Sequence, residues 1–426
     1  MSVQDKTTKL EKKAYIWNTM AGLVNAAEAV FMSMIVTRTT GLTDAGILTI
    51  AFAIGNLMMP IAKFGVRNYQ VTDVQNRFSF SIYLKARLFT VILMVLTLIG
   101  YLLYASTQLN YGRDKVSIIF AICMIYMVES LEDVVWGYYQ RRGRIDVGAR
   151  MFCFRWFGIF IIFWSVLRSG RDLATALFCC LPVSLFIFIV LLRISYPRVC
   201  DENERVVSLI IHMEDVRRIG ELLVKVFPLF GITFLSFYVN NAPKYAIDRC
   251  LSDEVQACYG FVAMPVFVIA LLNNFVYQPT LVLMAVEWEK KLTKKFVNRI
   301  WRQLGVIGVM SVICLAGAYW IGIPVLSWLY HTDLSAYKQE LMVLLMAGGF
   351  LAVSGYLSVV LTIMRCQQSL LWPYCLVSAV AVIGLQWIVA YHGTIGAALS
   401  YLCLMVLLCL LYGMILIKKL RIGNET

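Results

Sequence analysis

A chain of 426 residues in which 60% are hydrophobic and only 15% are charged is more apolar than a soluble protein, because soluble domains carry about 25% charged residues. The excess apolar surface must face lipid, which excludes soluble enzymes, secreted disulfide-linked proteins and disordered scaffolds. The net charge of +13 is expected to mark the cytoplasmic loops of a membrane protein rather than a nucleic-acid surface.

Twelve apolar runs of spanning length follow one another along the chain. A membrane helix needs about 20 predominantly apolar residues. The runs and the polar breaks between them predict spans at residues 14–37, 43–64, 82–105, 115–139, 148–168, 173–193, 222–247, 255–286, 304–330, 338–364, 369–391 and 394–417. The eighth run is overlong and contains Pro265 and Pro279, which predict a kink.

The distribution of basic residues along the loops supports this map. Starting from the N-terminus, every second connection is rich in Lys and Arg. The exception is the connection between the tenth and eleventh predicted spans, which holds Arg365 alone. The intervening connections hold at most two basic residues each. By the positive-inside rule, the chain is expected to be a multi-pass protein of the cell membrane with both termini in the cytoplasm.

The longest polar interruption, residues 194–221, divides the spans into two sets of six. It leads into an amphipathic stretch at residues 206–225, which predicts a short interfacial helix. We therefore expect an N-terminal six-helix lobe at residues 1–200, a cytoplasmic linker at 201–221 and a C-terminal six-helix lobe at 222–426. Equal halves joined by one long linker are typical of transporters built from parallel repeats.

Several predicted spans contain polar or ionisable side chains in stripes along one helix face. Such groups are costly at membrane depth and are expected to face water or one another. The stripes are Asn25 and Glu28 in the first span; Glu129, Glu132 and Asp133 in the fourth; Asn240, Asn241, Lys244 and Asp248 in the seventh; and Asn273, Asn274, Tyr277 and Gln278 in the eighth.

Each acidic stripe has a structural and a functional interpretation. For Glu28, two interpretations are equally open. It either lines a cavity or couples transport, or it forms an ion pair with a base on a neighbouring helix that holds the helices together. For Glu132 and Asp133, an ion network with the basic stretch at residues 141–144 is the favoured interpretation.

The basic residue of the seventh span favours a functional interpretation. Lys244 lies among polar neighbours, and a base in a water-filled cleft is a natural partner for an anionic substrate. Asp248 is either part of the same site or the internal counter-ion of Lys244.

The sequence contains no sign of catalysis, cofactor binding or metal binding. Phosphate-binding loops, hydrolase motifs and zinc-protease motifs are absent. The 12 cysteines lie mostly in apolar runs and the 3 histidines have no ligand spacing. We therefore expect a non-enzymatic chain that moves a substrate across the bilayer.

Three segments resemble the bacterial polysaccharide flippases, which act on lipid-linked oligosaccharides and belong to the multidrug/oligosaccharidyl-lipid/polysaccharide exporter superfamily. The first is Phe64–Asp73, and the second is Glu132-Asp133 with Gly137, Gln140 and Gly143–Asp146. The third, and the most specific, is Asn241–Asp248 with Gln256-Ala257 and Tyr259-Gly260. The segments cover about a tenth of the chain, while the number of spans matches along its whole length.

This resemblance implies an all-α integral membrane fold, a V-shaped bundle of two six-helix lobes like that of the MATE transporters. It implies a polyprenyl-diphosphate-linked oligosaccharide as substrate, turned from the inner to the outer leaflet for capsule, exopolysaccharide or O-antigen assembly. Carried over by position, Lys244 would be a cavity base and Asn240 and Asn241 would be donors to sugar or phosphate. Arg67 and Arg144 would meet the headgroup at the cytoplasmic mouth, or only follow the positive-inside bias.

The resemblance also implies an energy source and partners. With no nucleotide site in the sequence, an ion gradient is expected to drive alternating access, with Glu28 or Glu129, beside Asn25, as the coupling group. Membrane lipids, a polysaccharide polymerase and glycosyltransferases of the same pathway are the expected partners, and nucleic acid is not. The alternative is a cation-coupled multidrug exporter of the same superfamily, which would need acidic rather than basic cavity groups.

Overall fold

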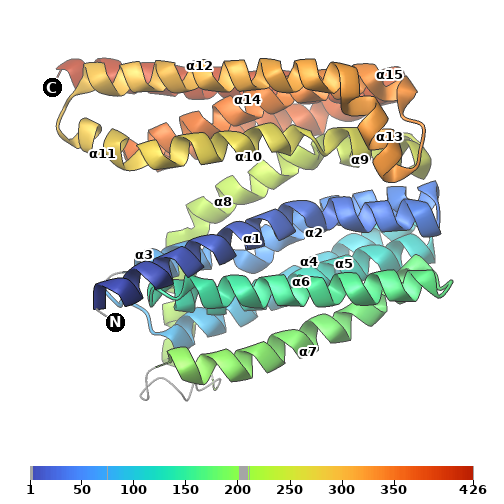
Figure 1. The fold of residues 1–426 in the computed structure, drawn as a ribbon, viewed down its shortest axis with the longest axis horizontal. Helices are drawn as coiled ribbons and strands as arrows, with labels where there is room; N and C mark the ends of the chain where they lie inside the picture. The colour runs from blue at the N-terminus through green and yellow to red at the C-terminus, as the bar shows by residue number, and fades with distance from the viewer. Residues whose placement is uncertain (1–2, 74, 201–209, 211, 426) are drawn as a thin grey trace. The chain divides into compact units, whose positions relative to one another are not determined.

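The structure is a computed structural model that describes residues 3–73, 75–200, 210 and 212–425, and these form helices joined by short connections, without strands. The chain divides into two compact units, Met1–Phe234 (unit 1) and Leu235–Thr426 (unit 2) (Figure 1). The predicted all-α architecture is therefore confirmed.

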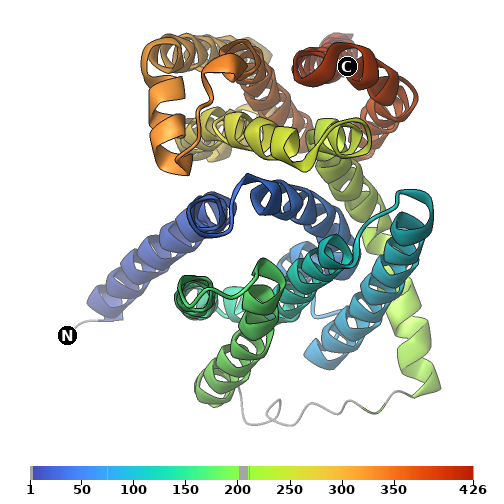
Figure 2. The ribbon, with the colours of Figure 1, turned by 90° about the vertical axis from the view of Figure 1, so that its right-hand side faces the viewer.

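Unit 1 contains the first six predicted spans and one short helix that the sequence analysis does not predict. Its helices are α1 (Val3–Thr39), α2 (Leu42–Lys63), the short α3 (Val66–Thr72), α4 (Phe80–Gln108), α5 (Arg113–Arg141), α6 (Ile145–Arg168), α7 (Leu173–Val199) and the first part of α8 (Met213–Cys250). Helix α1 packs on α6, α2 packs on α4 and α5, and α7 packs on α5 and α6 (Figure 2). Helices α5 and α6 thus lie between the other elements of the unit.

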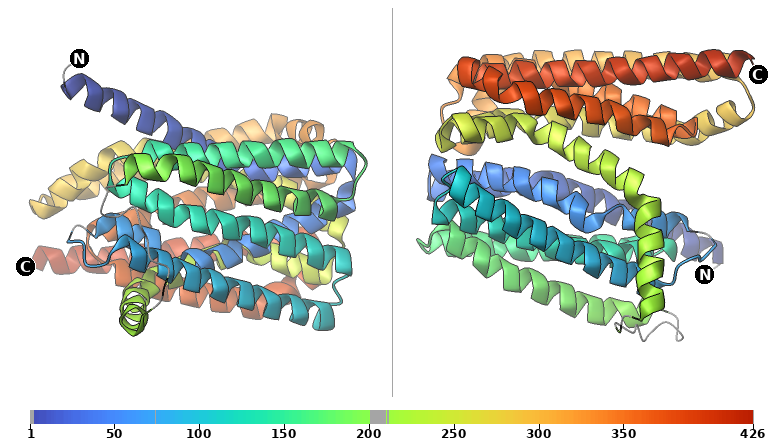
Figure 3. Two further views of the ribbon diagram at one scale, coloured as in Figure 1. Left: turned by 90° about the horizontal axis from the view of Figure 1, so that it is seen from below. Right: turned by 180° about the vertical axis from the view of Figure 1, so that it is seen from behind.

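Unit 2 contains the remaining spans, several of them interrupted. Its helices are the second part of α8, α9 (Asp253–Ala263), α10 (Val266–Tyr277), α11 (Leu281–Glu289), α12 (Thr293–Gly317), α13 (Ile323–Tyr330), α14 (Lys338–Ile363) and α15 (Leu371–Glu425). The predicted eighth span is broken beside Pro265 and again at the 3-10 turn Gln278–Thr280, which includes Pro279. Helix α15 reverses direction at Gly393, where φ is 60°, so that it holds the last two predicted spans (Figure 3).

The predicted linker differs from the structure on its C-terminal side. Residues 201–209 and 211 lie outside the described residues. From Met213 onward the chain forms α8 without interruption to Cys250, so the described part of the predicted interfacial helix is continuous with the predicted seventh span. Residues 213–225 are mostly good helix formers without proline, so the local sequence gives no reason for the helix to end. The division between the units lies inside α8, and the predicted lobe boundaries stay a prediction.

Among the described residues, nine helical stretches are long and apolar enough to cross a membrane. The last of them, Gln367–Arg421, is 55 residues long and holds two predicted spans. The predicted fourth and eighth spans are not among the nine, because α5 is rich in acidic residues and the eighth is broken into α9, α10 and α11. With these included, the chain is a multi-pass membrane protein of about twelve spans.

The connection between α3 and α4 is held by one carboxylate. Asp73 accepts hydrogen bonds from the backbone N–H of Arg77 (3.1 Å) and Phe78 (3.2 Å). The Tyr83 hydroxyl donates to the same carboxylate at 2.8 Å. Burial by itself would raise the pKa of Asp73, but these donors together hold that pKa below its ordinary value. The connection fixes the end of α3, the helix that carries Arg67.

A glycine allows α2 and α5 to approach closely. A Cβ atom placed on Gly55 would lie 2.8 Å from the Tyr126 ring. We therefore expect Gly55→Ala to destabilise the protein by about 1–3 kcal/mol through overpacking. The measurement is the melting temperature in detergent, compared with Gly100→Ala. A Cβ on Gly100 meets nothing within 4 Å, so that control is expected to be neutral or stabilising. Equal melting temperatures for the two variants would contradict the expectation.

Candidate functional site

Three acidic side chains of α5 lie on one face of the helix because they are spaced by three and four residues. Glu129, Glu132 and Asp133 are 4%, 1% and 8% exposed. Buried charges need partners of opposite sign, because their desolvation is otherwise uncompensated. The bases that meet this face come from four other elements of unit 1.

Asp133 binds two arginines that are distant in sequence. Its Oδ1 pairs with Arg67 Nη1 at 3.1 Å, and its Oδ2 pairs with Arg87 Nη2 at 2.8 Å. Arg87 is fully buried and also donates to the Ala62 carbonyl at 2.6 Å. Arg67 in addition donates to Gln140 at 2.8 Å. The counter-charges for Asp133, the last acid of the α5 stripe, thus come from the short helix α3 and from α4.

Glu129 and Glu132 share an arginine from α6. Arg155 is fully buried, and its Nε binds Glu132 Oε2 at 2.7 Å while its Nη2 lies 3.4 Å from Glu129 Oε2. Lys63, the last residue of α2, binds the other oxygen of Glu129 at 2.9 Å. Every carboxylate of the stripe therefore meets at least one base within the described residues.

The predicted network is right in kind, but its predicted partners are wrong. Two arginines of the basic stretch at 141–144 bind other partners. Arg141 donates to the Asp73 carbonyl at 2.8 Å, and Arg144 pairs with Asp146 at 3.0 Å. Lys63 and Arg87 lie within the first or last turns of their predicted spans, where basic residues are typical of cytoplasmic helix ends, so the sequence does not single them out as partners. The signal that could have identified Arg155 is its position well inside the predicted fifth span.

The ion network lines a cavity of about 330 Å³ inside unit 1. Its polar lining includes Asn25 of α1, Lys63, Arg67, Glu129 and Asp133. The structure therefore brings three predicted site residues, Asn25, Arg67 and Glu129, to one cavity. We refer to it below as the charged cavity.

Glu28 lies beside the charged cavity, one helical turn after Asn25. Its side chain is 6% exposed, and the Tyr126 hydroxyl donates to its Oε1 at 2.7 Å. Its Oε2 is buried and has no hydrogen-bond partner among the described residues. Glu28 differs in this respect from the α5 acids, each of which meets a base.

The charges around this cavity come from more residues than those that line it. The lining holds three acids, Glu129, Glu132 and Asp133, and two bases, Lys63 and Arg67. Arg87 and Arg155, which are fully buried, pair with the same acids. Any group that changes its charge here also changes the pairing of its neighbours.

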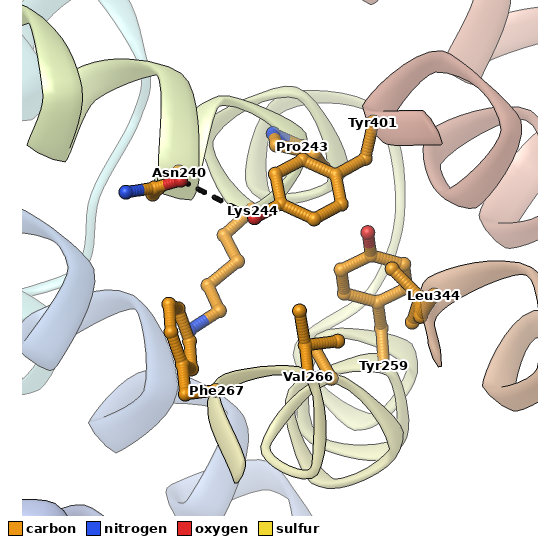
Figure 4. A pocket seen from close by; sticks show the side chains of 9 residues that line it. Asn240, Pro243, Lys244, Tyr259, Val266, Phe267, Leu344 and Tyr401 are labelled. Atoms are coloured by element: carbon orange, nitrogen blue, oxygen red, sulfur yellow. Dashed lines mark hydrogen bonds between the residues drawn. The ribbon is translucent and has the colours of Figure 1, made fainter. Parts of the chain in front are cut away.

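Unit 2 contains a second candidate site around Lys244 of α8 (Figure 4). It is a narrow pocket of about 10 Å³, the room of about one water molecule. Its lining includes Asn240, Tyr259, Phe267 and Tyr401. The Tyr401 hydroxyl donates to Asn240 Oδ1 at 3.2 Å. The four residues come from α8, α9, α10 and α15, so packing of the whole unit shapes the pocket.

The ammonium group of Lys244 is the unusual feature of this pocket. Its side chain extends toward Phe267, as Figure 4 shows. Among the described residues, no carboxylate pairs with it and no acceptor receives a hydrogen bond from it. A partly buried base that has no counter-ion among the described residues, in a pocket lined mostly by apolar side chains, is suited to an anionic partner.

The other predicted residues of α8 do not enter this pocket. Asn241 is buried and donates to the Phe237 carbonyl of its own helix at 3.1 Å. Asp248 is partly buried one turn beyond Lys244, and no ion pair joins the two within the described chain. The substrate-binding roles of Asn241 and Asp248 therefore stay predictions. Arg144 lies in unit 1, in a different pocket from the charged cavity.

Comparison with known proteins gives a fold but no sequence relative. No family model matches the chain, and no curated protein matches its sequence. The lipid II flippase MurJ, in an inward closed conformation, has a TM-score of 0.68 at 12% identity, with 96% of this chain and 89% of MurJ covered.

Two transporters of the MATE family are similar to the same degree. An inward-facing multidrug resistance MATE transporter of the MOP superfamily has a TM-score of 0.66 at 11% identity, covering 95% of this chain and 96% of that one. The eukaryotic MATE transporter AtDTX14 also has a TM-score of 0.66, at 13% identity, with 98% and 99% covered. The chain thus has the fold of the MATE transporters and MurJ, as the resemblance in its sequence implies.

Proposed function

We propose that this protein is a flippase that moves a polyprenyl-diphosphate-linked oligosaccharide from the inner to the outer leaflet of the cell membrane. The product would serve the assembly of a surface polysaccharide such as capsule, exopolysaccharide or O-antigen. Alternating access would move the headgroup while the polyprenyl tail stays in lipid, because a diphosphate with sugars cannot cross about 30 Å of hydrocarbon unaided. The shared fold with a lipid flippase supports this proposal.

The observation that carries the proposal is that the base of one site has no counter-ion, whereas the acids of the other site are paired. Lys244 has no counter-ion among the described residues, whereas the acids of the α5 stripe are all paired with bases. An uncompensated base favours a diphosphate headgroup. A cation-coupled multidrug exporter, the alternative, would need uncompensated acids to hold a cationic substrate, and of the four acids described above only Glu28 meets no base among the described residues.

Cellular context forms part of the same proposal. We place the protein in the cytoplasmic membrane with both termini in the cytoplasm. Its partners there would be membrane lipids, the substrate, a polysaccharide polymerase and the glycosyltransferases that build the repeat unit. We propose no catalytic step, cofactor or nucleic-acid partner for this chain.

The test is the pool of lipid-linked oligosaccharides in cells that lack the protein, measured by mass spectrometry. Accumulation of a polyprenyl-diphosphate repeat unit, relieved when the wild-type gene is restored, would support the flippase. A normal lipid pool together with new sensitivity to cationic dyes would contradict it and support the multidrug exporter.

Coupling to an ion gradient is proposed for Glu28. Its Oε1 accepts from Tyr126 and its Oε2 has no partner among the described residues, so Glu28→Gln keeps the fold and the accepted hydrogen bond. The variant is expected to melt within a few degrees of the wild type and to lose the response of transport to an imposed ion gradient. The measurement is transport in proteoliposomes with the gradient intact and collapsed.

Glu221→Gln is the control for this variant, because Glu221 is an exposed acid of α8. Glu129 is the second coupling candidate, so Glu129→Gln is measured beside it. If both Glu28→Gln and Glu129→Gln respond to the gradient as the wild type does, coupling through these carboxylates is wrong.

A further inference from the structure

A third cavity, of about 200 Å³, lies between α6 and α7 in unit 1. Three arginines line it: Arg144 directly before α6, Arg150 of α6, and Arg198 near the end of α7. It shares no lining residue with the charged cavity. The coupling role of Glu28 does not use it, and the sequence resemblance involves only one of its arginines, Arg144, so the three arginines together call for a separate explanation. We refer to it as the arginine pocket.

One buried carboxylate positions two of the three arginines. Asp146 is 1% exposed and binds Arg144 Nε at 3.0 Å and Arg150 Nη2 at 2.6 Å through different oxygens. Each guanidinium has five N–H donors, so both arginines keep donors for a ligand. Their planar groups are thereby oriented before any ligand arrives, which lowers the entropic cost of binding.

The third arginine has no such partner. Arg198 is exposed, and no ion pair or hydrogen bond joins it to another described residue. Among the described residues, three positive charges therefore face one negative charge in the arginine pocket. Because α6 begins at Ile145, the positive end of its dipole adds to this excess.

Apart from Ser195, the rest of the arginine pocket is apolar, and some of its apolar side chains are exposed. Phe154 of α6 and Ile194 of α7 are 50% and 48% exposed, and Leu191 of α7 also lines the pocket. A soluble anion would not bury these side chains. A ligand that carries both a phosphate and a hydrocarbon chain would satisfy the arginines and the apolar wall together.

We propose that the arginine pocket binds a phosphate-headed lipid, with its phosphate on Arg144, Arg150 and Arg198 and its chain along Phe154, Leu191 and Ile194. Basic pockets between membrane helices are a known way of holding lipid headgroups. Two lipids share this chemistry, an anionic phospholipid of the bilayer and a polyprenyl phosphate. The inference stands on the pocket and does not depend on the proposed transport function.

The test is lipid binding to the purified full-length protein in a neutral detergent, followed by native mass spectrometry. The probes are phosphatidylglycerol, a polyprenyl monophosphate and, as the uncharged reference, phosphatidylcholine. Soluble glycerol 3-phosphate is added as a competitor that has the headgroup without the chain. Arg198→Gln is the main variant, since Arg198 has no ion pair or hydrogen bond with another described residue to lose.

Arg217→Gln is the matched control, an exposed arginine of α8 with 85% of its side chain accessible. We expect one anionic lipid to bind the wild type and Arg217→Gln alike, and about tenfold more weakly to Arg198→Gln, as for the loss of one charge-assisted hydrogen bond. Glycerol 3-phosphate should not displace it at equal concentration. Equal melting temperatures of the variants exclude a folding defect.

The anionic lipid that binds more tightly identifies the source. Preference for phosphatidylglycerol indicates a bilayer lipid held as part of the protein, and preference for the polyprenyl phosphate indicates an additional site for a substrate-like lipid. Binding that is unchanged by Arg198→Gln, or equal for phosphatidylcholine, would overturn the proposal.

Discussion

Arg155→Met is expected to destabilise the protein by about 3–5 kcal/mol, the largest effect on stability that the structure predicts. Arg155 is fully buried and pairs with Glu132 at 2.7 Å and with Glu129 at 3.4 Å. Methionine fills much of the volume but leaves Glu132 without its base. The measurement is the melting temperature and the folded yield after size-exclusion chromatography in detergent.

Two further variants separate loss of the ion pair from loss of side-chain volume. Arg168→Met changes an exposed arginine at the end of the same helix and should melt like the wild type. The double variant Arg155→Met with Glu132→Gln removes the uncompensated charge and is expected to recover most of the lost stability. If the double variant is as unstable as the single one, the ion pair is not the cause.

Lys244→Met is expected to lower transport by roughly 30-fold or more while leaving the fold intact. The loss follows if the ammonium contacts the diphosphate directly, because removing one partner of a desolvated charge pair costs about 2–5 kcal/mol. Stability should be unchanged or rise by about 1 kcal/mol, since methionine replaces a partly buried charge that has no partner among the described residues. Few substitutions are expected to lower transport and leave stability equal or higher.

The measurements are transport of the lipid-linked oligosaccharide in proteoliposomes and the melting temperature of the same preparation. Arg249→Met, an exposed base at the end of α8, is the control and should resemble the wild type in both. A Lys244→Met variant that transports at the wild-type rate would remove the main support for an anionic substrate.

Most of the helices could be predicted because their signal is local. Runs of about 20 apolar residues and the turns between them are visible in the sequence, as are the prolines that break the eighth span. The exceptions have local reasons as well. Helix α3 is only 7 residues long, and α8 begins early because residues 213–225 favour a helix.

The candidate sites were predictable only in part, because an ion pair joins residues that are distant in the chain. The stripe of α5 was visible from its spacing, and so was Lys244 among its polar neighbours, although Asp248 stayed open as its counter-ion. Nothing in the sequence shows that Asp133 meets Arg67 and Arg87, 66 and 46 residues away. Only the packing of α2, α4, α5 and α6 in three dimensions determines those partners.

The position of Arg155 opposite the acids of α5 has a consequence for biosynthesis. Helix α5 is too acidic to count among the nine apolar stretches, so it is a poor candidate to enter the bilayer alone. Its neutralising arginine is made next, on α6, after a connection of only three residues. The two helices are therefore expected to leave the translocon together as a hairpin, and ribosomes stalled before Arg155 should leave α5 outside the lipid.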